Sequence, residues 1–157
     1  MSSPHRDTLS AFVKRHRWTK GAELGVDKGL LFRALLTSNQ QLHLTGVDVF
    51  PLPDRKDRVY QIALSFADRC RLICDTTHRA ADQFPDGHFD FVFIDADHSY
   101  DAAKDDIARW RSKVRSGGWL GGHDYNKTFP GVMAAVDEAF GRRVTLLSPG
   151  SIWGVTL

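Results

Sequence analysis

The sequence predicts an α/β fold, a doubly wound three-layer sandwich built on a mostly parallel, seven-stranded sheet with an antiparallel last strand. Three observations predict it. Strand-like apolar segments alternate with helical patterns along the 157 residues. Segment 89–95 is almost continuously apolar, which is typical of a parallel strand buried on both faces. The turn Ser148-Pro149-Gly150 is so short that it joins only antiparallel neighbours, so the two final strands run in opposite directions.

The individual elements follow from periodicity and from turn residues. Strands are expected in the run that leads into Gly25 and at 42–48, 71–74, 89–95, 119–122, 143–147 and 152–157. Helices are expected where apolar residues recur at helical spacing, around 9–16, 30–35, 59–66, 103–114 and 132–140, with a short helix at 79–83. The first helix is expected to pack beside the site, as a lid or as plain cover. Residues 1–157 are expected to form a single domain, because the length suits one sheet covered on both faces.

Composition argues against several classes of protein. The net charge of +2 calls for no nucleic-acid partner. No apolar run approaches the roughly 20 residues of a membrane span, so we expect no membrane contact and a cytoplasmic location. Cys70 and Cys74 are too few for a disulfide scaffold. Their even spacing on one expected strand predicts two reduced thiols in the core.

Residues 22–29 (AELGVDKG) read as a strand, a tight turn and the start of a helix. Gly25 stands where the backbone must turn sharply, and Gly29 stands where free N–H groups at the helix start attract polar ligand atoms. Asp48 ends the next expected strand, at the position that takes ribose hydroxyls in nucleotide-binding folds. An alternative interpretation, in which the glycines serve packing alone, stays open.

The pattern E-x-G-x-x-x-G with Asp48 resembles motif I and the acidic loop of class I S-adenosylmethionine (SAM)-dependent methyltransferases. Asp27 stands where that family usually has its middle glycine. Residues 93–100 (FIDADHSY) and 117–125 (GGWLGGHDY) resemble two motifs of small bacterial members. The resemblance spans nearly the whole chain and implies a Rossmann-like fold with SAM as the cofactor.

Acidic residues follow the expected strands at the edge where ligands bind in open parallel sheets. They are Glu23, Asp48, Asp75, Asp95 and Asp124. Gathering so many carboxylates is costly unless hydroxyls, cations or a metal satisfy them. SAM offers ribose hydroxyls, an adenine amine, an α-ammonium and a sulfonium, so it suits such a rim.

The resemblance implies a part of the cofactor for each position. The backbone at Gly25 and Gly29 would approach the methionine moiety, with Glu23 supporting that loop or the ammonium. Asp48 would take the ribose, with Val49 and Phe50 beside the adenine. Asp75, with Thr76, would meet the adenine amine, although a turn or helix-cap role for Asp75 stays open. The expected cofactor-binding set is Glu23, Gly25, Gly29, Asp48, Val49, Asp75, Thr76 and Asp95.

The expected catalytic residues are Asp95, His98 and Asp124. His98 is the expected general base because histidine titrates near neutral pH, with a purely structural histidine as the alternative. In catechol-type O-methyltransferases, which this region resembles, the matching aspartates bind a divalent metal. That implies a metal on Asp95 and Asp124, but the amide that supplies a third ligand there is replaced by Tyr125.

The function expected from these residues is methyl transfer from SAM to a small-molecule or sugar acceptor, on oxygen. Two alternatives stay open: a nicotinamide-dependent oxidoreductase of similar fold, and a non-catalytic module that binds SAM or a nucleotide. The absence of G-x-G-x-x-G argues against the oxidoreductase. The expected partner is a small-molecule substrate, and a homodimer through the terminal strands is a further expectation.

Overall fold

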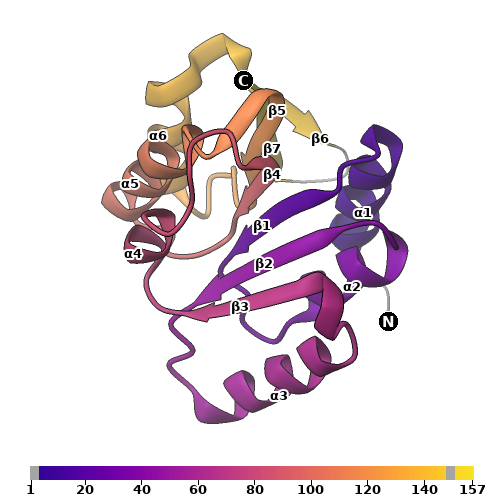
Figure 1. Cartoon of the computed structure of the whole chain (residues 1–157). Coiled ribbons are helices and arrows are strands. Elements are labelled where there is room, and N and C mark those ends of the chain that lie inside the picture. Colours follow the sequence, from indigo (N-terminus) through magenta and orange to yellow (C-terminus); the bar gives the residue numbers. More distant parts are fainter. Residues whose placement is uncertain (1–3, 148–150) are drawn as a thin grey trace.

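A computed structural model describes residues 4–147 and 151–157, and these residues form a seven-stranded sheet in the order β3-β2-β1-β4-β5-β7-β6 (Figure 1). The strands are β1 (Lys20–Leu24), β2 (His43–Asp48), β3 (Cys70–Cys74), β4 (Phe89–Ile94), β5 (Val114–Gly122), β6 (Thr145–Leu147) and β7 (Ile152–Thr156). Strand β7 runs antiparallel to both β5 and β6, and the remaining pairs are parallel. The predicted doubly wound sheet with an antiparallel last strand is confirmed.

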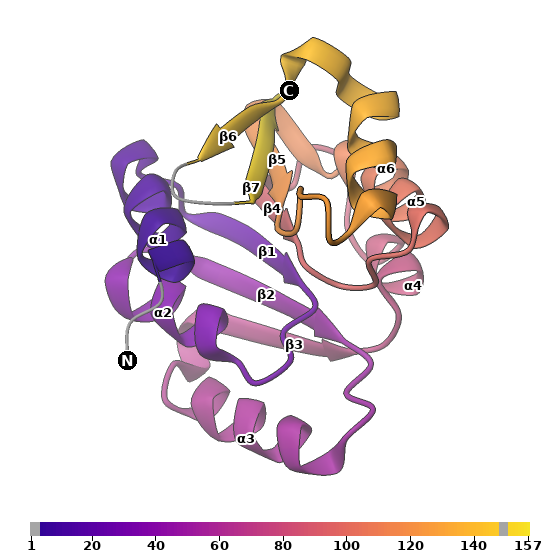
Figure 2. The same ribbon diagram turned by 180° about the vertical axis from the view of Figure 1, so that it is seen from behind.

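Helices cover both faces of this sheet (Figures 1 and 2). The first group is α1 (Pro4–His16), α2 (Leu30–Ser38) and α3 (Pro53–Leu64). The second group is α4 (Thr77–Ala81), α5 (Tyr100–Arg111) and α6 (Pro130–Phe140). Two separate apolar cores follow this division, since buried side chains of α1–α3 pack on one face and those of α4–α6 on the other.

Strand β4 explains why both faces must be covered. Phe91 and Phe93 point into the core beneath α1–α3, whereas Val92 and Ile94 point into the core beneath α4–α6. All four are nearly or fully buried. Alternate side chains of a strand face opposite sides, so four consecutive apolar residues require two covering layers.

The order in which the chain forms the strands determines where a ligand site is expected. From β1 the chain moves outward through β2 to β3, then returns to lay β4 on the other side of β1 before continuing to β5. Strands β1 and β4 are therefore neighbours at the point where the direction of winding reverses. The crevice beyond the carboxyl ends of such strands is the usual ligand site of open α/β sheets. In Figure 2 the arrowheads of β1, β2 and β3 point to the same edge.

Two expectations from the sequence are wrong in detail. Val114 was expected on a helix, but α5 ends at Arg111 and Val114 is the first residue of β5. Cys70 and Cys74 were expected in the core, but Cys70 is half-buried and Cys74 is exposed. The reason is that β3 is an edge strand of the sheet and only part of it is covered.

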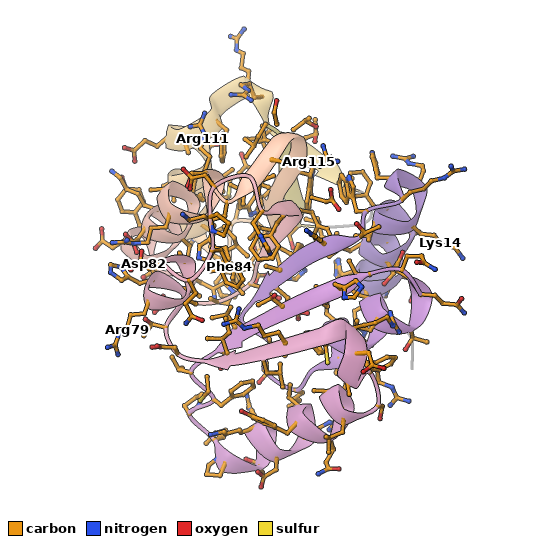
Figure 3. All side chains as sticks on the ribbon, in the orientation of Figure 1. Lys14, Arg79, Asp82, Phe84, Arg111 and Arg115 are labelled. Atoms are coloured by element: carbon orange, nitrogen blue, oxygen red, sulfur yellow. The ribbon has the colours of Figure 1, made fainter. Side chains whose placement is uncertain are left out.

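The surface is charged and the interior is apolar, as Figure 3 shows for the labelled Lys14, Arg79 and Arg111, which reach outward. Phe84, in contrast, is buried in the core beneath α4 and α5. Within the described residues, no helix is long and apolar enough to cross a bilayer. The expected turn Ser148-Pro149-Gly150 lies outside the described residues.

Trp110 ties α5 to the start of α4. Its side chain is fully buried, and its indole Nε1–H donates to the carbonyl oxygen of Thr77 at 3.2 Å. Because α4 begins directly behind Asp75 and Thr76, this contact also fixes one wall of the site.

Replacing Trp110 by alanine should lower the free energy of unfolding by about 3–5 kcal/mol, the usual cost of removing a buried aromatic side chain. Trp110→Phe keeps most of the ring and should lose less, mainly the hydrogen bond of about 1 kcal/mol. Urea denaturation followed by circular dichroism measures both. Tyr60→Ala, at a side chain that is 42% exposed, is the control and should change stability by under about 0.5 kcal/mol. An alanine variant as stable as the wild type would contradict this packing.

Candidate functional site

A cleft of about 860 Å³ opens beyond the carboxyl ends of β1, β2 and β4. It brings together most of the residues expected from the sequence, namely Glu23, Gly25, Asp48, Val49, Asp75, Thr76, Asp95 and His98. Gly29 and Asp124 are not among the lining residues. The Gly29 N–H donates to the carbonyl oxygen of Val26, and Asp124 Oδ2 lies 2.7 Å from His98 Nε2, so each contacts a residue that lines the cleft. Residues between Glu23 and Asp124 thus supply most of one site.

Gly25 is required by the close approach of two backbone segments. Its φ is +85°, and a Cβ added there would lie 1.9 Å from the carbonyl oxygen of Asp95. Gly29, with φ +71°, serves packing, because a Cβ there would lie 2.9 Å from Ile62 Cδ1 on α3. Asp27 also has a positive φ, of 49°, a conformation that aspartate tolerates better than most residues. Arg55 of α3 donates to the Asp27 carboxylate and fastens the turn.

Asp48 organises this turn with its side chain. Its Oδ2 accepts from the backbone N–H of Val26 and of Asp27, each at 2.9 Å, and its Oδ1 accepts from the N–H of Phe50 at 2.6 Å. A carboxylate has about four acceptor positions, so roughly one is left for a ligand hydroxyl. The role of Asp48 in building the loop was not expected from the sequence.

Glu23 is the most unusual group of the cleft. It is only 2% exposed, and its Oε2 finds no hydrogen-bond partner among the described residues. Burial raises the pKa of Glu23 well above its ordinary value, and the neighbouring carboxylates of Asp95 and Asp48 raise it further. A buried, unpartnered carboxyl group of this kind destabilises the fold unless a cation or a donor binds it.

The loop after β3 is built from its own polar groups. Asp75 Oδ1 accepts from the N–H of Thr76 at 2.8 Å, and Thr76 Oγ1 caps α4 by accepting from the N–H of Arg79 at 3.3 Å. Thr76, and not Asp75, is therefore the helix cap. The second carboxylate oxygen of Asp75 has no such local bond within the described chain, and Asp75 lines the cleft.

His98 lies between two carboxylates. Its Nε2 is 2.7 Å from Asp124 Oδ2 and 3.6 Å from Asp95 Oδ1. The Asp95 carboxylate raises the pKa of His98 above its ordinary value, with Asp124 adding to the effect and burial opposing it. The imidazole also packs against the ring of Phe129, at 4.4 Å between centroids. This arrangement favours the imidazolium form and holds the ring in one place.

A second histidine shares Asp124. His123 Nδ1 lies 3.1 Å from Asp124 Oδ1, so each oxygen of this carboxylate faces one imidazole. Asp124 adopts a positive φ of 60°, which turns its side chain into this position at some cost in backbone strain. The neighbouring Tyr125 hydroxyl donates instead to Asp137, at 2.6 Å.

The side chains of Asp95, His98 and Asp124 are close enough to share a cation, with ligand atoms within 4.8 Å of one another. The donor set differs from an all-oxygen site. Tyr125 turns away to Asp137, and the amide oxygen of Asn126 accepts from the N–H of Thr128 within its own turn. His98 would contribute a nitrogen, its Nε2, which lies 2.7 Å from Asp124 Oδ2.

Sequence reasoning missed several residues of the cleft. Helix α1 contributes His5, Arg6 and Leu9 to the cleft. The helical pattern of the sequence predicted a covering helix there, but it did not predict which of its residues face the cleft. Asp106 of α5 was also missed. It is 3% exposed, lines the cleft, and burial raises its pKa to about 6. A lone aspartate on a helix carries no sequence signal that separates it from a solvent-exposed one.

Comparison with known proteins identifies the family to which this chain belongs. The family model described as a methyltransferase domain matches residues 22–125, the segment that forms most of the cleft. No curated protein matches the sequence significantly.

Solved structures match over nearly the whole chain. The TDP-rhamnose 3′-O-methyltransferase of calicheamicin biosynthesis has a TM-score of 0.78 at 18% identity, covering 98% of this chain and 80% of its own. An O-methyltransferase from Bacillus cereus, in complex with S-adenosylhomocysteine (SAH), has a TM-score of 0.74 at 17% identity, covering 100% and 83%. The SAH-bound methyltransferase PaMTH1 from Podospora anserina has a TM-score of 0.76 at 15% identity, covering 99% and 79%.

At these identities the solved structures establish the fold, and the family match establishes the kind of protein. That match also decides against the nicotinamide-dependent alternative. The chain belongs to the methyltransferase-domain family and is a class I SAM-dependent methyltransferase.

Proposed function

We propose that this enzyme transfers the methyl group of SAM to a hydroxyl oxygen of a small molecule or sugar, with His98 as the general base. The observation that carries the proposal is the imidazole of His98, which lines the cleft and lies 2.7 Å from one carboxylate and 3.6 Å from another. The similar folds of two O-methyltransferases, one of which acts on TDP-rhamnose, support oxygen as the acceptor atom.

The unpartnered carboxyl group of Glu23 is evidence that the cleft is the binding site for SAM. SAM, when bound, supplies an electrophilic methyl group and carries an α-ammonium. That ammonium fits Glu23, because a cation beside a buried carboxylate removes the cost of its burial. The remaining acceptor positions of Asp48 and Asp75 fit ribose hydroxyls and an adenine amine, and the exposed Val49 side chain offers an apolar edge beside them.

His98 supports proton removal. As a new bond forms between the acceptor oxygen and the methyl carbon, the hydroxyl proton passes to the imidazole, and the bond from that carbon to sulfur breaks. The imidazolium that results lies beside the carboxylates of Asp95 and Asp124, which stabilise its positive charge. Both aspartates therefore act in the step without giving up or accepting a proton.

A divalent cation on Asp95 and Asp124 is the second candidate for activating the acceptor. The distance of 4.8 Å that spans these ligand atoms favours it. The position of His98 beside Asp124 favours direct base catalysis instead, because the same oxygen would have to leave the imidazole to bind a metal.

A homodimer and a cytoplasmic location stay predictions. The exposed Leu146 on edge strand β6 supports an interface there.

Replacing His98 by alanine should lower kcat by about 10²–10⁴-fold, the usual contribution of a general base, while SAH affinity stays within a factor of about 2. Because the carboxylates raise the pKa of His98, wild-type kcat should fall as the pH drops through that raised value, and the variant should lose this dependence. Transfer of labelled methyl from SAM to a panel of hydroxyl acceptors measures kcat, and calorimetry measures SAH binding.

His43→Ala, at an exposed histidine on β2, is the matched control and should behave as the wild type. Each assay is repeated after dialysis against a chelator. Unchanged turnover of His98→Ala would remove His98 from the mechanism. Turnover that is lost on chelation and restored by Mg²⁺ would favour the metal.

Glu23→Gln should stabilise the unliganded protein increasingly as the pH rises above 4.5, the ordinary pKa of glutamate, and it should weaken SAH binding by at least about tenfold. A carboxyl group with a raised pKa contributes stability below its unfolded value near 4.5, and that contribution is lost as the pH rises through the folded value. The glutamine variant should lack this loss, and it also lacks the charge that pairs with an ammonium. Thermal unfolding between pH 5 and pH 9, with and without SAH, measures both effects. A variant that binds SAH as tightly as the wild type would exclude the Glu23–ammonium pair.

A further inference from the structure

Helix α1 places a histidine against the loop that follows β5. The ring of His5, in the first turn of α1, meets the ring of His123 edge-on, at 4.8 Å between centroids and 74° between planes. His123 in turn shares the carboxylate of Asp124 with His98. A residue far away in the sequence is therefore part of the wall next to the proposed base.

We propose that His5 and His123 form the binding subsite for the acceptor, and that they hold a hydroxyl group next to the one that is methylated. This proposal rests on the proposed function. Both histidines line the cleft together with Asp95 and His98. Unlike His98, neither is proposed to exchange a proton with the acceptor.

Two ring nitrogens carry this proposal. His5 Nδ1 and His123 Nε2 are both buried, and neither has a hydrogen-bond partner in the part of the chain that the structure describes. A neutral imidazole has one donor and one acceptor nitrogen, and a buried polar atom without a partner costs about 1–3 kcal/mol. The two rings are 4.8 Å apart and both line the cleft, so a bound molecule that has a donor and an acceptor close together would satisfy both atoms.

Helix α1 holds His5 in a fixed position. Leu9 and Val13, one and two turns further along the helix, are fully buried, and Leu9 also lines the cleft. Figure 2 shows α1 lying beside α2 over the same face of the sheet. A histidine on a packed helix loses little further conformational entropy when a ligand binds, so it is suited to selecting one geometry of acceptor.

The surroundings favour a neutral acceptor with adjacent hydroxyl groups on a saturated ring. The carboxylate of Asp124, 3.1 Å from His123 Nδ1, disfavours an anionic group there, and the carboxylate of Asp95 lines the same cleft. Arg6 also lines the cleft but has interactions of its own. Among the described lining residues, the phenylalanines are Phe50 and Phe93, at 6% and 2% exposure, so the cleft offers no broad aromatic face on which a planar acceptor could stack.

The test measures methyl transfer to methyl glycosides of six-carbon sugars, to their monodeoxy analogues and to catechol, with the wild type and with His5→Ala. We expect the wild type to methylate at least one glycoside, with a catalytic efficiency at least about tenfold above that for catechol and for the analogue lacking the adjacent hydroxyl. His5→Ala should raise the KM of the glycoside about tenfold and abolish the preference over the deoxy analogue. The KM of SAM and the affinity for SAH should not change, and His5→Asn, which restores a donor and an acceptor, should recover most of the loss.

His16→Ala is the matched control, since this histidine lies on the same helix with its ring stacked on Trp18, and it should leave every constant unchanged. Transfer to a glycoside with an equal KM in His5→Ala and wild type would overturn the subsite while leaving the proposed function intact. A preference for catechol would overturn the class of acceptor. No transfer to any hydroxyl compound, in protein that binds SAH, would overturn oxygen methylation and the subsite together.

Discussion

The burial of acidic side chains at one edge of the sheet is the constraint on which the rest of this structure depends. Winding outward from β1 in both directions brings the carboxyl ends of the parallel strands together, and acidic residues stand at or just after the ends of β1 to β5. Glu23 is the most deeply buried of them and lies near both Asp95 and Asp48. Packing alone would disfavour this arrangement, so the acidic groups must be satisfied by other means.

Hydrogen bonds and ion pairs within the protein satisfy most of these acidic side chains. Asp48 is held by three backbone N–H groups, and Asp124 is shared between two imidazoles. Among the acidic residues of the described chain, Glu23 alone keeps a buried oxygen without a partner. Asp48 and Asp124 thereby hold the loops of the cleft in place, whereas the burial of Glu23 stays uncompensated within the described chain.

Much of the fold could be predicted because its causes are local. Alternating periodicities, the apolar run of β4 and the strand-turn-helix around Gly25 each follow from neighbouring residues. The errors arose where tertiary position decides. Cys74 is exposed because β3 became an edge strand, and Val114 left the predicted helix because it pairs with Phe89 of β4. The place of His5 beside His123 depends on how α1 docks, which no spacing in the sequence encodes.

The most direct test of the central claim is calorimetric titration of SAM and SAH into the folded protein. The account predicts saturable binding of one molecule per chain, with affinity that falls when Glu23 or Asp48 loses its charge. The absence of any binding heat for both compounds, in protein whose circular dichroism and cooperative unfolding show that it is folded, would contradict the claim that the acidic cleft is the seat of the cofactor.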